Sequence, residues 1–410
     1  MANDGLIIVG ASLAGAKAAE AARAAGWAAP IRLVGSEQHL PYERPPFSKG
    51  VLIGRDAPAV AYVHDPGFYV NNEIDLLLGG TATRLDLAER VVELGGGRRL
   101  SFEKVILATG STPRRLGAAE SGPPEVFYLR TVDDSLALRD HLVAGTRVAL
   151  IGASWIGAEV ASAARQRGCD VVLIDPLSTP LERVMGAEAG RFFADLHRGH
   201  GVDLHLGVGV EEIEGDEHVS GVRLADGSVI DADLVVVGVG VTPNVSLAAE
   251  AGLETGRGVL VNAELVTSHP DVYAAGDIAE AEHPLCDGRV IVEHWSNALN
   301  QGLVAGSNAA GTTRPYDRIP YFFSDQYDMG MEYSGWPVAW DNVVFRGDAG
   351  SGEFVVFYLS AGRVVGGANI NVWDVNEHVQ ALIAANAVVD VGVLTDLSVD
   401  PTEWVSRALR

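Results

Sequence analysis

The chain has 410 residues, of which 48% are hydrophobic and 20% are charged, and its formal net charge is -24. This length exceeds one ordinary hydrophobic core, so we expect two or three domains. An acidic surface repels nucleic acids and anionic membranes, which argues against both as partners. It leaves room for an acidic protein partner that docks on a local basic patch.

The sequence predicts a cytoplasmic protein. No run approaches the roughly 18 apolar residues of a membrane span, and the first residues show no basic segment followed by an apolar one. The two cysteines, Cys169 and Cys286, lie far apart and have no metal-ligand spacing. They suggest a reducing compartment and no bound metal.

A βαβ unit is predicted at the start of the chain. An apolar strand over 6–9 leads into an alanine-rich helix over 17–25, and a strand over 31–34 follows. Alanine favours the helix, and Gly26 is the usual kind of helix stop. The strand and helix are joined by the turn Gly10-Ala11-Ser12-Leu13-Ala14-Gly15.

This turn directs the amides of a helix N-terminus toward a pyrophosphate. Gly10 permits the tight turn, and Gly15 permits close packing of the helix on the strand. Ser12 replaces the middle glycine of the usual pattern. An acid near the end of the second strand holds a ribose hydroxyl in such units, and Glu37 is the candidate, with Ser36 one position earlier.

A second unit repeats the design in the middle of the chain. A strand over 148–151 leads into a helix over 158–166, and the next strand, over 171–174, ends at Asp175. The connecting turn is Gly152-Ala153-Ser154-Trp155-Ile156-Gly157. A carboxylate at Asp175 accepts hydrogen bonds from a ribose diol and repels a 2′-phosphate, which predicts NAD rather than NADP. Two such turns indicate two dinucleotide sites; the alternative is a pair of α/β units that bind nothing.

Further segments carry a family resemblance. The run 105–110 is a buried strand that ends in a turn of small residues, 272–277 closes on Gly276-Asp277, and 234–241 leads into Thr242-Pro243-Asn244. With the two turns, this order resembles the two-dinucleotide-binding-domain flavoproteins. Three other segments, 41–49, 293–298 and 323–327, resemble one branch, the FAD-dependent ferredoxin reductases of bacterial oxygenase systems. The departures are Ser12, Ser154, and Ser36 where the family usually has an acid.

The resemblance implies an α/β fold with two Rossmann-like domains of the glutathione-reductase type and a C-terminal α+β domain. The FAD-binding domain is expected to be discontinuous, over 1–114 and 245–320. The NAD-binding domain is expected over 115–244 and the C-terminal interface domain over 321–410.

The resemblance also implies the reaction. FAD takes a hydride from NADH and passes single electrons to a 2Fe-2S ferredoxin, which serves a haem monooxygenase or a Rieske dioxygenase. Relatives that reduce disulfides carry a redox cysteine in the stretch corresponding to 44–52, and this chain has none there. An NADH oxidase, a rubredoxin or quinone reductase, and a redox-responsive interaction flavoprotein stay open as alternatives. So does the choice between monomer and homodimer.

Three residues are candidates for the redox centre. Lys49 is expected beside the flavin, where a cation stabilises the anionic reduced ring, and the resemblance suggests Glu159 as its partner. Trp295 is expected to cover the flavin. Their alternatives are a surface lysine, a carboxylate on a helix face and a core tryptophan.

Other residues are expected at the cofactors. Arg44 is a candidate for the pyrophosphate of FAD, and Arg183 for the adenosine end of NAD. The resemblance places the remaining members of the set near the two cofactors: Ala82, Ala108, Thr109, Gly110, Arg130, Gly240, Gly276 and Asp277.

The last part of the chain changes in pattern. Strands are predicted over 342–346, 353–359 and 363–370, and a helix over 377–388. This part is expected to cover the flavin domain and to shape a docking surface or a dimer contact. The aromatic residues between Tyr316 and Tyr333 are interpreted as a core or interface stripe rather than a second cofactor site.

Overall fold

The computed structural model describes residues 4–119, 123 and 125–409, and the chain divides into two compact units. Unit 1 comprises 1–43, 61–112 and 242–321; unit 2 comprises 44–60, 113–241 and 322–410. Unit 2 thus joins the range expected to bind NAD with the range expected as the C-terminal domain. It also contains residues 44–60, which the sequence pattern places with the FAD-binding range. The chain passes between the units after 43, after 60 and after 321, and also within β7 (Ser111–Pro113) and β16 (Val241–Pro243).

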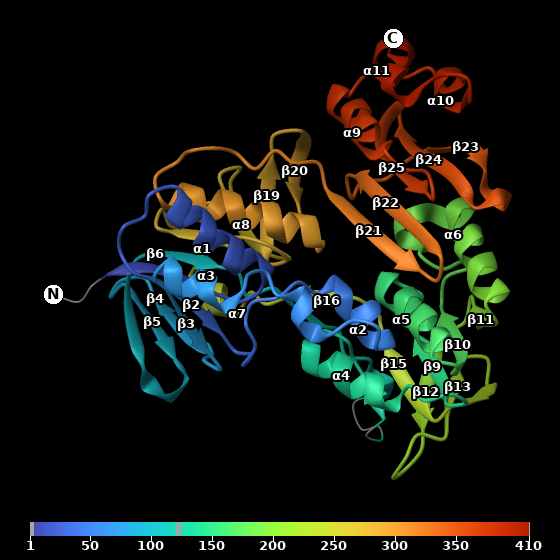
Figure 1. Cartoon of the computed structure of the whole chain (residues 1–410), viewed down its shortest axis with the longest axis horizontal. Helices are drawn as coiled ribbons and strands as arrows, with labels where there is room; N and C mark the ends of the chain where they lie inside the picture. Colours follow the sequence, from blue (N-terminus) through green and yellow to red (C-terminus); the bar gives the residue numbers. More distant parts are fainter. Residues whose placement is uncertain (1–3, 120–122, 124, 410) are drawn as a thin grey trace. The chain divides into compact units, whose positions relative to one another are not determined.

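Unit 1 is built on a seven-stranded sheet (Figure 1). Strands β1, β2, β3, β6 and β18 run parallel, whereas β5 pairs antiparallel with both β6 and β4. All five residues of β1 are buried, as its apolar sequence predicts. The bounds are β1 (Gly5–Val9), β2 (Ile31–Gly35), β3 (Ile74–Leu78), β4 (Ala82–Asp86), β5 (Val91–Leu94), β6 (Arg99–Leu107) and β18 (Val272–Ala274).

Helices α1 (Leu13–Ala24) and α8 (Trp295–Ala309) pack side by side on this sheet (Figure 1). Their close approach depends on glycine. A Cβ on Gly302 would lie 2.4 Å from the carbonyl oxygen of Ala14, and one on Gly306 would lie 2.1 Å from that of Ala18. Unit 1 is completed by α3 (Pro66–Asn71), α7 (Ser246–Glu250), β17 (Val259–Val261), β19 (Ala279–His283) and β20 (Cys286–Val290).

Unit 2 contains a second, fully parallel sheet in the order β11-β10-β9-β15-β8. The turn after β9 opens α5, as the repeated glycine pattern predicts, and α6 follows β10. The bounds are β8 (Val126–Phe127), α4 (Val132–His141), β9 (Arg147–Ile151), α5 (Trp155–Gln166), β10 (Asp170–Asp175), α6 (Glu182–Gly199), β11 (Asp203–Leu206) and β15 (Leu234–Val237). A separate antiparallel sheet comprises β12 (Val210–Glu214), β13 (Gly221–Leu224) and β14 (Val229–Asp231).

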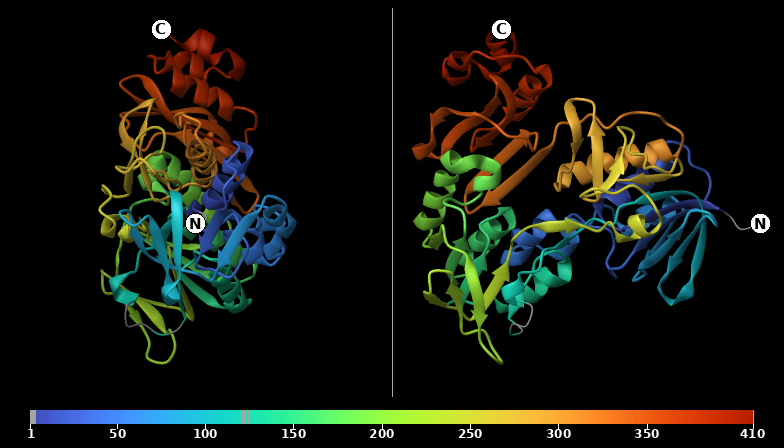
Figure 2. Two further views of the ribbon diagram at one scale, coloured as in Figure 1. Left: turned by 90° about the vertical axis from the view of Figure 1, so that its left-hand side faces the viewer. Right: turned by 180° about the vertical axis from the view of Figure 1, so that it is seen from behind.

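The C-terminal part of unit 2 forms a five-stranded sheet in the order β21-β22-β25-β24-β23, on which α9, α10 and α11 pack (Figure 2). The three predicted strands are present, and the predicted helix ends three residues early because Asn386 adopts a left-handed conformation, with φ 46°. The bounds are β21 (Tyr321–Gln326), β22 (Met329–Gly335), β23 (Asn342–Asp348), β24 (Glu353–Ser360), β25 (Arg363–Ile370), α9 (Asn376–Ala385), α10 (Val391–Thr395) and α11 (Trp404–Ala408).

The predicted fold class is confirmed: two α/β units of the Rossmann type are followed by an α+β domain. The hairpin β21–β22 was not predicted, because its aromatic residues hid the alternation of a strand. Among the described residues, no helix combines the length and apolar character that a bilayer crossing requires.

A buried arginine is expected to stabilise the C-terminal domain. Arg346 of β23 is 9% exposed, and its guanidinium donates to the carbonyls of Leu394 (3.3 Å), Asp396, Leu397 (3.5 Å) and Val399 (2.8 Å). Arg346→Ala removes the hydrogen-bond donors of these carbonyls, so we expect a loss of about 2–4 kcal/mol in the free energy of unfolding. Urea denaturation measures the loss. Arg346→Lys keeps the charge but not the planar guanidinium, so its stability should lie between those of the wild type and Arg346→Ala. An alanine variant as stable as the wild type would contradict the prediction.

Candidate functional site

The residues predicted for the first cofactor meet at one edge of the unit 1 sheet. Strands β1, β2, β6 and β18 are parallel, so their carboxyl ends share this edge. Ligands of such sheets bind at the carboxyl ends of the strands. The predicted residues that directly follow these strands are Gly10, Ser12, Leu13, Ala14, Gly15, Ser36, Glu37, Ala108, Thr109, Gly110, Gly276 and Asp277. Ala82, by contrast, opens β4, on the antiparallel side of the sheet.

The first glycine turn has the geometry of a phosphate cradle. Gly10 has φ 124°, and a Cβ there would lie 2.0 Å from the carbonyl oxygen of Ala108. A Cβ on Gly15 would lie 1.9 Å from the carbonyl oxygen of Gly10. Only glycine therefore lets α1 begin so close to β1, with its first amides at the open edge. These residues fit the pyrophosphate of a dinucleotide.

Ser12, which replaces the middle glycine, is turned away from its own helix. Its hydroxyl makes no capping bond and donates to the carbonyl of Tyr42 at 3.2 Å. The Tyr42 hydroxyl in turn donates to Glu37. Glu37 is partly buried and Ser36 is exposed. Ser12 thus holds the segment 41–49 through Tyr42, and the backbone amide of Ser12 remains available to the cradle.

Asp277 is held by a neighbouring strand. The hydroxyl of Ser111 donates to its carboxylate at 2.7 Å. The amide of Gly276 donates to Gln301 of α8 at 2.8 Å. Thr109 and Asn244 form two bonds with each other's backbone carbonyls, of 2.9 and 2.8 Å. The Gly-Asp pair and the turn after β6 are therefore fixed by side chains of the same unit.

Trp295 is the first residue of α8 and is half-buried. Its indole N–H donates to the carboxylate of Glu43 at 2.9 Å. This bond fixes the edge of the ring. Because Trp295 is only half-buried, the alternative of a core tryptophan does not describe this residue.

The second glycine turn, in unit 2, is built on the same constraints. Gly152 has φ 102°, and a Cβ on it would lie 2.5 Å from the carbonyl oxygen of Gly238. A Cβ on Gly157 would lie 1.9 Å from the carbonyl oxygen of Gly152. The hydroxyl of Ser154, the N-cap of α5, donates to Gly238 at 2.8 Å and accepts weakly from the Gly157 amide at 3.4 Å. The turn therefore also fits a pyrophosphate, and Ser154 ties it to the residues after β15.

Asp175 ends β10 beside this turn. Its carboxylate accepts from the backbone amides of Ala153 at 2.7 Å and Leu177 at 2.8 Å. Each carboxylate oxygen has a second lone pair, so the group can still accept bonds from a ribose diol. The two amides hold the charge at the carboxyl end of β10, where an acid in a unit of this type accepts from a ribose diol.

The other residues predicted for the NAD site differ in their surroundings. Ile156 is 40% exposed at the start of α5, and Gly240 follows β15 with φ 100°. Arg183 is exposed on the first turn of α6 and makes no ion pair within the described part of the chain. The ring of Trp155 packs on Phe322 instead, with the ring centroids 4.7 Å apart. The backbone amide of Trp155 lies in the first turn of α5.

A buried ion pair lies at the first turns of α5. Lys49 Nζ is 2.8 Å from Glu159 Oε1, and the two side chains are 14% and 5% exposed. The hydroxyls of Ser48 and Ser324 also donate to the Glu159 carboxylate, the latter at 2.7 Å. Lys49 Nζ further lies 5.4 Å from the centroid of the Phe323 ring, within the range of a cation–π interaction. Neither of the alternatives, a surface lysine and a solvated helix-face carboxylate, describes this pair.

The charges of Lys49 and Glu159 act on the carboxyl group of Asp325, which follows Ser324 on β21. Desolvation raises the pKa of Asp325, Lys49 opposes the rise and Glu159 adds to it. The Lys49–Glu159 pair is thus the centre of a small charged cluster.

Within unit 2, hydrogen bonds hold the segment that carries Lys49 from two sides. It consists of the 3₁₀ turn Pro45–Ser48 and α2 (Gly50–Ile53). The hydroxyl of Ser135 on α4 donates to the carbonyl of Phe47 at 2.7 Å. The guanidinium of Arg167 donates to the carbonyl of Ile53 at 2.7 Å. Arg44, at the start of the segment, donates to the carbonyl of Arg130, which brings these two predicted residues together.

The surroundings of Cys169 do not favour a redox role. Cys169 is fully buried, and desolvation raises the pKa of its thiol, which disfavours a thiolate. Cys286 lies on β20 of unit 1 and is partly buried. The described residues contain no cluster of three metal-ligating side chains.

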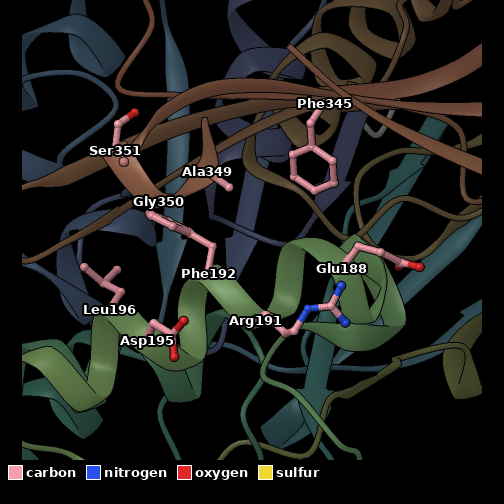
Figure 3. A pocket seen from close by; sticks show the side chains of 10 residues that line it. Glu188, Arg191, Phe192, Asp195, Leu196, Phe345, Ala349, Gly350 and Ser351 are labelled. Carbon is pink, nitrogen blue, oxygen red and sulfur yellow. The ribbon is translucent and has the colours of Figure 1, made fainter. Parts of the chain in front are cut away.

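An open hollow on unit 2 lies apart from the predicted residues. One face of α6, with Glu188, Arg191, Phe192 and Asp195, lies opposite Phe345 and the turn after β23 (Figure 3). It contains no residue predicted for a cofactor. The candidate site therefore consists of the two glycine cradles and the Lys49–Glu159 cluster.

Two α/β units, each with a glycine cradle at the carboxyl ends of its parallel strands, are the arrangement of a dinucleotide-dependent oxidoreductase. The family model described as pyridine nucleotide-disulphide oxidoreductase matches residues 4–302, and the one described as reductase C-terminal matches 321–404. The chain belongs to the pyridine nucleotide-disulphide oxidoreductase family. Because 44–52 has no cysteine, it lacks the thiol that disulfide chemistry requires.

Individual relatives are similar to this chain over nearly its whole length. The ferredoxin–NAD(+) reductase component of the anthranilate 1,2-dioxygenase system of Burkholderia cepacia is 39% identical, over 97% of this chain and 98% of that protein. Putidaredoxin reductase of Pseudomonas putida is 35% identical, over 99% and 98%. The solved covalent putidaredoxin reductase–putidaredoxin complex has a TM-score of 0.95 at 35% identity and covers 99% of each chain. The resemblance to bacterial ferredoxin reductases is confirmed.

Sequence reasoning missed the partners of the predicted residues. Ser48 and Ser324 at Glu159, Glu43 at Trp295 and Ser111 at Asp277 were not among the candidates. The segments 41–49 and 323–327 were singled out only for their resemblance. No local pattern marks a serine that becomes a donor to a carboxylate more than 100 residues away.

Proposed function

We propose that this chain is an NADH:ferredoxin reductase that binds FAD at the cradle of unit 1 and NADH at the cradle of unit 2. The observation that carries the proposal is the pair of turns in which a Cβ on Gly15 or Gly157 would lie 1.9 Å from a backbone oxygen. Such turns bring helix amides to a pyrophosphate, and an oxidoreductase with two of them can pair two dinucleotides.

FAD, when bound, supplies the redox chemistry: it accepts the hydride of NADH and releases the electrons singly to a 2Fe-2S ferredoxin. The residues of the chain bind and orient. Asp277 is the proposed partner of the ribityl and pyrophosphate groups, and Trp295, held at its edge by Glu43, the proposed cover of the ring. Lys49 supplies positive charge for the anionic reduced form, and Glu159 holds the ammonium in place.

The identity of the electron acceptor is supported by the relatives. One is named for an anthranilate 1,2-dioxygenase system, and a solved structural relative is joined covalently to putidaredoxin. We therefore propose a ferredoxin that serves a haem monooxygenase or a Rieske dioxygenase. A cytoplasmic location is supported by the sequence, which has two cysteines far apart and so no disulfide framework.

We also propose a functional division that follows the cofactors: FAD on 1–114 and 245–320, NAD on 115–244, and an interface domain on 321–410. The separate family matches over 4–302 and 321–404 support the last boundary. The compact packing of 44–60 with unit 2 adds that Lys49 belongs structurally with the NAD-binding range.

Anaerobic titration of the purified protein with NADH, followed by absorbance, tests the proposal. We expect bleaching of an oxidised flavin spectrum at about one NADH per chain, followed by rapid reduction of an added 2Fe-2S ferredoxin. Rapid oxygen consumption with slow ferredoxin reduction would instead identify an NADH oxidase. A colourless protein, or a bound flavin that NADH does not reduce, would refute the proposal.

The choice of NADH over NADPH is expected to depend on Asp175. Asp175→Asn keeps the shape and one acceptor but removes the charge that repels a 2′-phosphate. We expect the KM for NADH to rise roughly tenfold and the preference for NADH to relax by a similar factor. Steady-state kinetics with both nucleotides measure the change. An unchanged preference would place the discrimination elsewhere.

A further inference from the structure

A buried chain of hydrogen bonds connects Glu159 to Tyr327. Ser324 Oγ donates to Glu159 Oε1 at 2.7 Å, and Gln326 Nε2 donates to Ser324 Oγ at 3.2 Å. His197 Nε2 lies 3.1 Å from Gln326 Oε1, and His197 Nδ1 lies 3.0 Å from the Tyr327 hydroxyl. The side chains of Ser324, Gln326 and His197 have no solvent exposure. The chain joins α5, β21 and α6 within unit 2.

The carboxylate at one end fixes the direction of every bond. An ionised Glu159 only accepts, so the Ser324 hydroxyl donates to it, and the Ser324 oxygen then accepts from the amide nitrogen of Gln326. The amide oxygen of Gln326 consequently faces His197. It can only accept, so the imidazole carries its proton on Nε2.

The far end of the chain follows from the same rule. A neutral imidazole protonated on Nε2 has an acceptor at Nδ1, and the Tyr327 hydroxyl donates to it. All four donors therefore point toward Glu159. Successive dipoles aligned toward a buried anion stabilise it, and aligned hydrogen bonds strengthen one another.

The surroundings of His197 keep it neutral. Desolvation lowers its pKa to about 4. The groups that face it are Gln326 of β21, Tyr327 of the turn after β21, and His200, which directly follows α6. Asp328 lies 4.0 Å from His200, and Arg165 of α5 acts on Tyr327. None of these places a carboxylate in contact with the His197 ring among the described residues.

Tyr327 is held in a conformation that is unusual for its residue type. Its φ is 57°, in the left-handed region that glycine favours. Its amide donates to Ser162 of α5 at 2.7 Å, and its ring stacks on His200 with centroids 3.7 Å apart. These contacts and the tight turn between β21 and β22 fix the place of the Tyr327 hydroxyl beside His197.

We propose that Gln326, His197 and Tyr327 are positioning residues, which hold the Glu159 carboxylate in the orientation that pairs with Lys49. Oε1 of Glu159 is shared by Lys49 and Ser324, and the other oxygen accepts from Ser48. The chain keeps Ser324 turned toward this oxygen and so fixes the rotation of the carboxylate. The inference rests on the proposed role of the Lys49–Glu159 pair at the flavin.

The first test needs no turnover. Long-range ¹H–¹⁵N correlation spectra of the histidine-labelled protein report the protonation and tautomer of each imidazole, and the His197 signals are assigned by their loss in His197→Gln. We expect a neutral ring protonated on Nε2 at pH 7. A ring protonated on Nδ1, or a cationic ring at pH 7, would overturn the proposed direction of the chain.

The second test compares matched variants in single-turnover reduction of the bound flavin by NADH. His197→Leu removes both bonds, and we expect roughly tenfold slower reduction at saturating NADH with the Kd for NADH unchanged within about twofold. His197→Gln keeps a side-chain N–H and should stay within about threefold of the wild type. Tyr327→Phe, which keeps the ring stacking, should slow the reaction by about threefold.

A Glu159→Gln background separates the two proposals. If His197 acts through Glu159, His197→Leu should add no further slowing in that background, because the carboxylate it positions is gone. Equal slowing in both backgrounds would refute the positioning role. If Glu159→Gln alone leaves flavin reduction unchanged, the proposed role of the ion pair fails, and with it any role of His197 in the reaction.

Discussion

Replacing Gly157 with alanine is expected to lower kcat/KM for NADH by at least about a hundredfold while FAD stays bound, because small displacements of positioning groups cost that much. The added Cβ would lie 1.9 Å from the carbonyl oxygen of Gly152, and the first turn of α5 must move away from β9. The amides that meet the pyrophosphate move with it. The FAD cradle lies in unit 1 and contains none of the displaced atoms.

Gly199→Ala is the matched control. Gly199 lies at the end of α6 in the same unit, and no heavy atom lies within 4 Å of a Cβ built on it. Kinetics with NADH, the flavin absorbance and far-ultraviolet circular dichroism should match the wild type in this variant. Gly157→Ala should keep the absorbance and dichroism, and dithionite should still bleach its bound flavin. Normal NADH kinetics in Gly157→Ala would show that the turn after β9 does not hold the nucleotide.

The cradles could be predicted from the sequence because their requirements are local. Each cradle needs glycine where a Cβ would meet a backbone oxygen that lies within a few residues or after the adjacent strand. This holds for Gly10, Gly15, Gly152 and Gly157. The acid at the end of β10 is likewise fixed by the register of two neighbouring strands. A pattern confined to one βαβ unit is sufficient to place such residues.

The partners of the redox residues could not be predicted in this way. Glu159 accepts from Ser48 and Ser324, which are 111 and 165 positions away in the sequence. Trp155 shows the same limit from the other side. Its place in the glycine turn predicts a cofactor contact, which stays a prediction; the packing of its ring on Phe322 is a contact that no local pattern encodes.

The aromatic run between Tyr316 and Tyr333 divides into two roles. Phe322 and Tyr333 are buried in the core beneath the C-terminal sheet, which agrees with the prediction of a core stripe. Tyr327 instead ends the hydrogen-bond chain to Glu159. The difference depends on the left-handed turn after β21, which the sequence does not mark with glycine.

Removing the cation from the buried pair is expected to destabilise the protein strongly. Lys49→Met leaves the Glu159 carboxylate, 5% exposed, with only the two serine hydroxyls as donors. Removal of one partner of a buried ion pair costs about 3–5 kcal/mol in the free energy of unfolding. Urea denaturation at neutral pH measures the loss, and we expect slower flavin reduction by NADH in the same variant.

The double variant Lys49→Met with Glu159→Gln tests the physical reason. A neutral amide needs no cation, so the double variant should be more stable than Lys49→Met alone. Lys104→Met is the matched control: Lys104 also lies over an aromatic ring, 5.4 Å from the centroid of Tyr273, and has no ion pair within the described residues. Its loss should cost about 1 kcal/mol or less. If Lys49→Met were as mild as Lys104→Met, the Glu159 charge would be stabilised by its hydroxyl donors alone, and the ammonium would serve the flavin without supporting the fold.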